Sequence, residues 1–104
     1  MIFEINNELW RVCFVEPHSP VLMGTLGVTI LEEKTIYLAD DLYGELLHRV
    51  LCHELTHAEF AARGLILPVY VEECLADITA DNIVDVRSVA NSIHNNLCKY
   101  YNKC

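Results

Sequence analysis

The segment His53–His57, with the sequence His-Glu-Leu-Thr-His, constrains this chain more than any other feature. It places two histidines four residues apart, with a glutamate directly after the first. On a helix, residues four apart lie on the same face, one turn above each other. Two imidazoles in this arrangement can bind one zinc ion, each through a nitrogen at about 2.0–2.1 Å. The helix must therefore turn this face toward another part of the chain that supplies a further ligand.

Glu54 completes this pattern. At roughly 100° per residue, it lies about 100° round the helix from His53 and about 60° from His57. Its carboxylate is therefore expected beside the metal, where a bound water would sit. A glutamate in this position acts as general base in zinc-dependent peptidases.

Length and charge limit the possible partners. The chain has 104 residues, 53% of them hydrophobic, which predicts a single folded domain over residues 1–104. The net charge of -8 disfavours a nucleic acid or an anionic membrane as partner, because both require a basic surface. The sequence has no apolar run of about 18 residues and no basic, apolar leader at its start. We therefore expect a cytoplasmic protein with reduced thiols at its five cysteines, Cys13, Cys52, Cys74, Cys98 and Cys104.

The first forty residues are typical of β-structure. Residues 1–16 predict one or two short strands, with a turn at Asn6-Asn7. Residues 27–31 and 35–39 are both rich in β-favouring side chains and predict a hairpin closed by a short charged turn.

A long helix is predicted over residues 42–62. Asp40 or Asp41 is expected to cap its start, and Gly64 to end it. On a helical wheel both histidines face inward. The polar arc of the helix holds His48, Arg49, Thr56, Glu59 and Arg63, and His48 is expected to be a solvated surface residue. Cys52 falls in the same arc, which argues against it as a ligand of the metal.

A second helix is expected over residues 72–86, after a connecting loop over residues 65–71. Glu73 and Asp77 share its inward, apolar side, where carboxylates are costly unless they are paired or bind a metal. Glu72 lies further round and is expected to be solvated. A third helix is expected over residues 87–104. The predicted fold is therefore α+β, with a short antiparallel or mixed sheet packed on the first two helices and a C-terminal helix beside them.

Glu73 is the expected third metal ligand, since a catalytic zinc needs at least three protein ligands and one open position. Glu72 is the alternative. Asp77, one turn beyond Glu73, could accept the ring N–H of a zinc-bound histidine and fix its tautomer.

These residues resemble the signature of the gluzincin metallopeptidases, H-E-x-x-H followed by E-x-x-x-D. Here the two parts are His53–His57 and Glu73–Asp77, and the likeness covers about residues 24–85. The small size and the E-E-x-x-A-D form resemble minigluzincins and the ImmA/IrrE-type peptidases of phages and mobile elements. The metzincins are excluded, because Phe60 and Arg63 stand where that branch requires glycine and histidine.

The resemblance implies a zincin-like fold and a set of roles. His53, His57 and Glu73 would bind zinc, Glu54 would be the base, and Asp77 would hold a zinc-bound histidine. The hairpin edge would receive an extended peptide or protein substrate. Larger gluzincins supply an oxyanion-stabilising tyrosine or histidine from a further domain. The residues that could replace it here are Tyr70, His94, Tyr100 and Tyr101.

Three functions fit this pattern. The first is a zinc metallopeptidase, a hydrolase that uses metal-activated water. The second is a catalytically idle zinc-binding domain that binds a partner protein or peptide along its sheet edge. The third is a latent enzyme whose C-terminal segment, ending at Cys104, covers the zinc.

Overall fold

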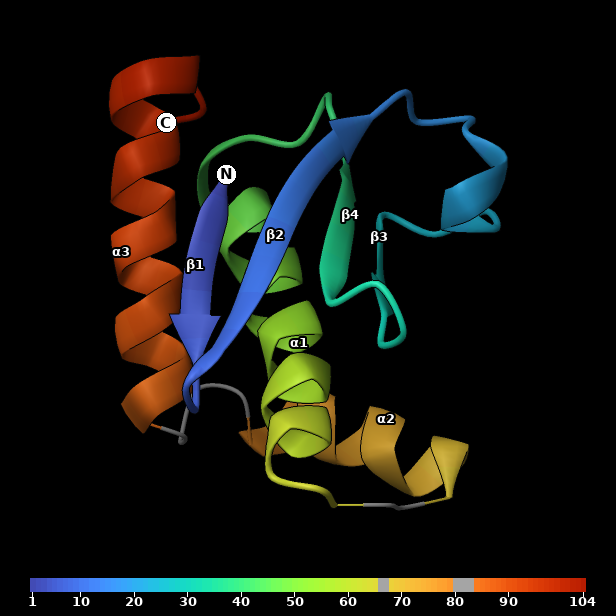
Figure 1. The fold of residues 1–104 in the computed structure, drawn as a ribbon. Helices are drawn as coiled ribbons and strands as arrows, with labels where there is room; N and C mark the ends of the chain where they lie inside the picture. The colour runs from blue at the N-terminus through green and yellow to red at the C-terminus, as the bar shows by residue number, and fades with distance from the viewer. Residues whose placement is uncertain (66–67, 80–83) are drawn as a thin grey trace.

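The computed structural model describes residues 1–65, 68–79 and 84–104. It has four strands, a short 3-10 helix and three α-helices (Figure 1). In chain order these are β1 (Ile2–Ile5), β2 (Glu8–Val15), η1 (Pro20–Leu22), β3 (Gly27–Ile30), β4 (Thr35–Ala39), α1 (Gly44–Ala62), α2 (Val69–Thr79) and α3 (Val84–Tyr101). The predicted α+β fold with a mixed sheet is confirmed.

The strands form one sheet in the order β1-β2-β4-β3. The first two are antiparallel and joined at Asn6-Asn7, where both residues have positive φ (50° and 68°), as tight hairpin turns require. β2 pairs in parallel with β4, and β3 pairs antiparallel with β4, so the predicted hairpin is confirmed. Among the described strands, β3 has a neighbour on one side only. Its other edge pairs with no described strand, although the Gly27 carbonyl accepts a hydrogen bond from the Thr25 hydroxyl at 2.9 Å.

The core lies between one face of the sheet and α1. Ile36 and Leu38 of β4 are fully buried, as are Leu47, Leu51 and Leu55 of α1. Figure 1 shows α1 behind the sheet, α3 alongside it and α2 crossing near the end of α1. The same helix therefore forms the centre of the core and carries the two histidines.

The C-terminal end of α1 agrees with the sequence prediction, and the N-terminal end does not. Gly64 follows the helix with φ 70°, in the left-handed conformation expected of a C-terminal glycine. The predicted aspartate cap is wrong, because the residue before the helix is Tyr43 and no side chain caps it. The Gly44 amide instead donates to the carbonyl of Lys103, at 2.7 Å. A segment distant in sequence has taken the place of a local cap.

The later helix boundaries also differ from the prediction. α2 begins at Val69, three residues early, because proline is tolerated just before a helix and the Pro68 carbonyl accepts a bond from the Glu72 amide (3.0 Å). Residues 84–86 belong to α3, so the predicted extension of the second helix to residue 86 is wrong. α3 ends at Tyr101, where Asn102 turns the chain with φ 59°.

The polar arc of α1 is only partly exposed to solvent. Arg49 and Arg63 are exposed, but Thr56 is fully buried and Glu59 is 5% exposed. His48 is half-buried and bonds Asn91 of α3 at 2.8 Å, so its predicted solvated position is wrong. α3 packs against this side of α1. Glu59 is compensated by Arg63, whose Nε lies 2.5 Å from its carboxylate.

Two expectations from composition can be compared with the fold. All five cysteines lie in the described part of the chain and carry thiols rather than disulfides. Of the helices described, none combines the length and apolar character needed to cross a bilayer.

Candidate metal centre

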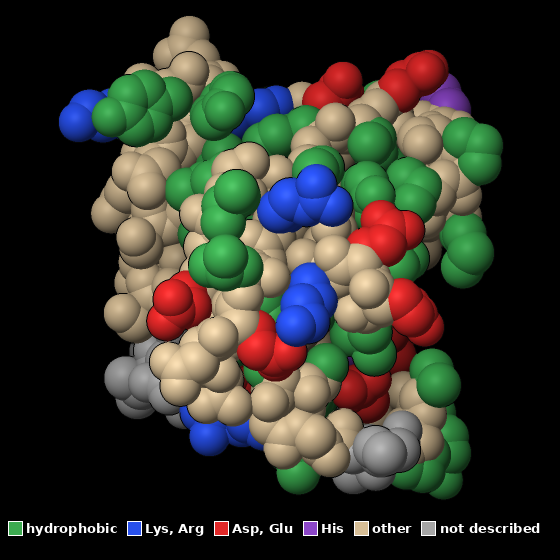
Figure 2. Space-filling view, in the orientation of Figure 1, with side chains coloured by type: hydrophobic (Ala, Val, Ile, Leu, Met, Phe, Trp, Pro, Cys, Tyr) green, Lys and Arg blue, Asp and Glu red, His purple; other side chains and the backbone are tan. Residues whose placement is uncertain are grey.

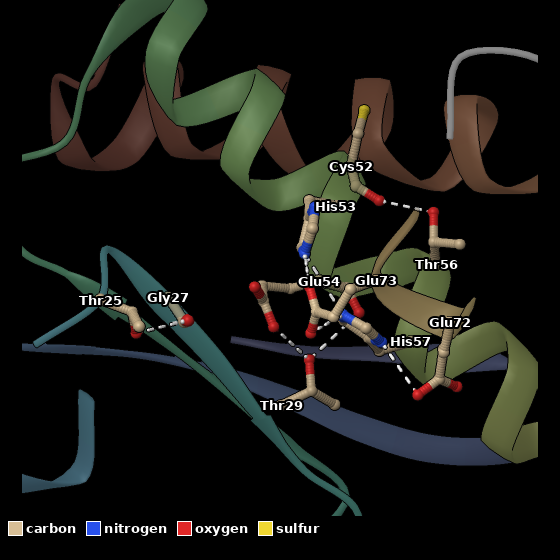
Figure 3. Close-up of polar contacts among 10 residues, drawn as sticks. All are labelled: Thr25, Gly27, Thr29, Cys52, His53, Glu54, Thr56, His57, Glu72 and Glu73. Atoms are coloured by element: carbon tan, nitrogen blue, oxygen red, sulfur yellow. Dashed lines mark hydrogen bonds and ion pairs between the residues drawn. The ribbon is translucent and has the colours of Figure 1, made fainter. Parts of the chain in front are cut away.

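The histidines of α1 and the glutamate of α2 meet where the two helices cross (Figure 3). The Nε2 atoms of His53 and His57 lie 3.3 Å apart. One Glu73 carboxylate faces both, with Oε2 3.0 Å from His53 Nε2 and Oε1 3.1 Å from His57 Nε2. These three side chains therefore form a set that could hold a metal ion.

The separations allow a metal ion between the three side chains. Ligand atoms at about 2.0–2.1 Å from a tetrahedral zinc lie about 3.3 Å from one another. The two histidine Nε2 atoms lie at this separation, 3.3 Å. The 3.0 and 3.1 Å separations belong to different oxygens of Glu73, and one ligand atom from each of the three residues lies within 4.8 Å of the others. Two imidazoles and one carboxylate are also a donor set that zinc accepts in catalytic sites, so these residues could hold the ion.

Glu72 contacts the other nitrogen of His57. Its Oε2 lies 3.3 Å from Nδ1, and its side chain is only 24% exposed, so it is not the solvated residue that the wheel predicts. A metal-binding histidine typically donates its second ring N–H to a carboxylate, which fixes the tautomer. Glu73 thus faces the two Nε2 atoms, and Glu72 lies at the outer nitrogen of His57.

Asp77 lies on α2, as predicted, one turn beyond Glu73. The structure describes the backbone of Asp77 but not its side chain, so the contact of Asp77 with a histidine stays a prediction. Cys52 is buried, and Figure 3 shows its sulfur pointing away from the three ligand atoms. This agrees with its exclusion as a ligand.

Glu54 lies beside the cluster in a buried position. Its side chain is 7% exposed, and its Oε1 accepts a hydrogen bond from the Thr29 hydroxyl at 2.8 Å. Burial raises the pKa of the Glu54 carboxyl, while the Thr29 hydroxyl and the two nearby histidines oppose this shift.

Thr29 is a site residue that the sequence analysis missed. The hairpin was predicted, but not which of its side chains face α1. The sequence does show that Ile36 and Leu38 alternate as apolar residues on one face of the second hairpin strand. The register of the hairpin then places Thr29 opposite Ile36, on that same face. A polar side chain opposite such a residue points inward and needs a partner.

A cavity of about 880 Å³ opens over the cluster. Its walls come from β3, the segment before it, α1 and α2. Apolar side chains make one wall: Leu22, Met23, Leu26, Val28, Leu31, Leu46 and Val50. The polar lining residues include three glutamates, Glu54, Glu72 and Glu73. In Figure 2, on the right-hand side, acidic side chains recede between hydrophobic ones above and below them.

The expected oxyanion-stabilising groups are not at this cavity. None of the four described candidates, Tyr70, His94, Tyr100 and Tyr101, lines it. Tyr70 is 74% exposed on α2, and His94 stacks on His48 at the far side of α1, with ring centroids 5.3 Å apart. The structure thus brings together the ligands and the base of the predicted site, but not this group.

Comparisons of the chain with protein-family models, with curated proteins and with solved structures found no match. Any activity must therefore be argued from the site itself.

Proposed function

We propose that this protein is a zinc-dependent peptidase of the gluzincin type. One observation supports the proposal: His53, His57 and Glu73 converge on one point where they could hold a metal ion, with the buried Glu54 beside them in the same cavity. Zinc binding alone would not require the fourth residue, which is the one that peptide hydrolysis needs.

The residues of the site have different roles. His53, His57 and Glu73 would hold the ion, which would supply Lewis acidity to polarise the scissile carbonyl and to lower the pKa of a bound water. Glu54 takes a proton from the attacking water and passes it to the leaving amine. The apolar wall and the open edge of β3 bind the substrate as an extended chain, because a strand edge pairs with peptide backbone.

The test compares the parent protein with Glu54→Gln. The parent, loaded with one zinc per chain, is expected to cleave a denatured protein mixture. A chelator should stop this cleavage and added zinc should restore it. Glu54→Gln should keep its zinc and lose about 10²–10⁴-fold in rate, because proton transfer no longer assists attack.

Two variants control this comparison. Glu32→Gln makes the same chemical change on an exposed residue of the hairpin turn and should leave the rate unchanged. His53→Ala should lose zinc and activity together. Full hydrolysis by Glu54→Gln would refute the base, and undiminished zinc content in His53→Ala would refute the metal centre.

The second candidate is a zinc-binding domain that holds a peptide without cutting it. The open edge of β3 beside an apolar wall favours it, since both features serve binding alone. A library of extended peptides separates the two functions. A peptidase releases fragments from the parent protein and not from Glu54→Gln. A binding domain retains intact peptides on both.

A further inference from the structure

We infer that Thr29 of β3 is the positioning residue of Glu54, holding its carboxylate toward the metal centre. The inference rests on the proposed function and adds to it a residue from outside the two motif-bearing helices.

The contact itself is well defined. Thr29 Oγ1 lies 2.8 Å from Glu54 Oε1 and 3.1 Å from the main-chain oxygen of Glu54 (Figure 3). A hydroxyl has one hydrogen to donate, so this donor is directed wholly at Glu54. Because threonine is branched at Cβ, its side chain has few rotamers, and the donor is fixed by the strand backbone.

Gly27 brings that backbone close enough. It lies two residues before Thr29, so both face α1. A Cβ at position 27 would lie 2.9 Å from Val50 Cγ1, 3.0 Å from Leu38 Cδ2 and 3.2 Å from Glu54 Cγ. Only a residue without a side chain lets β3 approach α1 this closely. The same approach places the Thr29 hydroxyl within reach of the carboxylate.

Water cannot replace this donor easily. Glu54 is 7% exposed, so a carboxylate that lost its partner would stay buried without a hydrogen bond or would rotate away. A general base must sit within hydrogen-bond reach of the proton that it takes. Removal of the hydroxyl should therefore slow the chemical step and leave substrate and metal binding unchanged.

Thr29→Val tests this, because valine has the shape of threonine without the donor. We expect kcat to fall by about 10–100-fold, part of the general-base contribution. KM and the zinc content should stay at parental values. Thr29→Ser keeps the hydroxyl and should restore kcat to within about threefold of the parent.

Thr35→Val is the matched control. Thr35 is a fully buried strand threonine on β4 whose hydroxyl bonds the Glu33 carbonyl at 3.0 Å, away from the metal centre. The Thr35→Val variant should have a lower melting temperature than the parent and an unchanged kcat. Parental kcat in Thr29→Val would overturn the inference and leave the proposed function intact. Equal losses of kcat in both variants would assign the effect to stability and also overturn it.

A second measurement tests the contact between Thr29 and Glu54 without relying on peptidase activity. The melting temperatures of the metal-free parent, Thr29→Val, Glu54→Gln and the double variant form a cycle. Non-additive shifts are expected if the two side chains interact, and additive shifts would overturn the contact. A zinc-loaded parent that cuts no peptide would overturn the proposed function and with it the role assigned to Thr29.

Discussion

Glu72 and Glu73 are neighbours in the sequence but contact different atoms of the metal centre. Glu73 faces the two Nε2 atoms, whereas Glu72 lies 3.3 Å from His57 Nδ1. The sequence predicted Glu73 as the ligand, because only one of the two has an aspartate one turn further on. It could not predict the contact made by its neighbour, since that depends on the angle at which α2 crosses α1.

The two glutamates are therefore expected to differ in their effect on zinc affinity. Glu72→Gln should weaken zinc binding by about 10–100-fold, as the loss of a partner to a ligating histidine typically does. Glu73→Gln removes a ligand and should weaken it further. Competition with a chromogenic chelator measures both, with Glu32→Gln as the control. A larger loss in Glu72→Gln than in Glu73→Gln would reverse the two roles.

Among the elements, the hairpin and α1 were predictable and the surroundings of α1 were not. The hairpin was visible because alternation along a strand is a local property, and α1 because its apolar positions recur with helical spacing. The burial of His48, Thr56 and Glu59 was not, because it is α3 that covers them. A helical wheel shows which residues share a face, but not whether another helix packs there.

The interface of α1 with α3 should respond to pH. Burial and the neighbouring His48 lower the pKa of His94 in the folded protein, and His94 also lies 3.8 Å from the Cys98 sulfur. A lowered folded-state pKa means that the unfolded state binds the proton more readily. The resulting stability is present above the unfolded pKa of about 6.5 and is lost as pH falls below it.

His94→Gln removes this titration. Between pH 7.5 and pH 5.5, its melting temperature should fall less than that of the parent, both measured in chelator to keep metal out. His18→Gln, at an exposed loop histidine, should follow the parent. An identical fall in His94→Gln and the parent would contradict the expected role of His94.

At the scale of the molecule, the candidate metal centre lies between two helices, α1 and α2, that pack against each other. α2 packs near the end of α1, away from the strands β1 and β2 (Figure 1). An ion bound by both helices would link α2 to the core. Metal binding would thus contribute to the stability of the whole domain, because only the folded chain brings the three ligands together.

Zinc should therefore raise the melting temperature. At a free concentration 100 times the dissociation constant, binding adds about 2.7 kcal/mol. For a domain of this size each kcal/mol corresponds to roughly 4–8 °C, so a rise of about 10–20 °C is expected. Calorimetry with zinc and with chelator measures it, and His53→Ala should show no rise. If zinc does not change the melting temperature of the parent protein, the assignment of all three ligands is contradicted.

The close approach that Gly27 permits also limits how this site could be transplanted. A designer who grafted the His53–His57 helix onto another scaffold would carry over two ligands and a base. Without a strand bearing a glycine at the contact and a hydroxyl two residues later, the base would have no fixed orientation. The smallest unit that could be transplanted therefore has three parts, a strand and two helices, although the recognisable motifs occupy only the two helices.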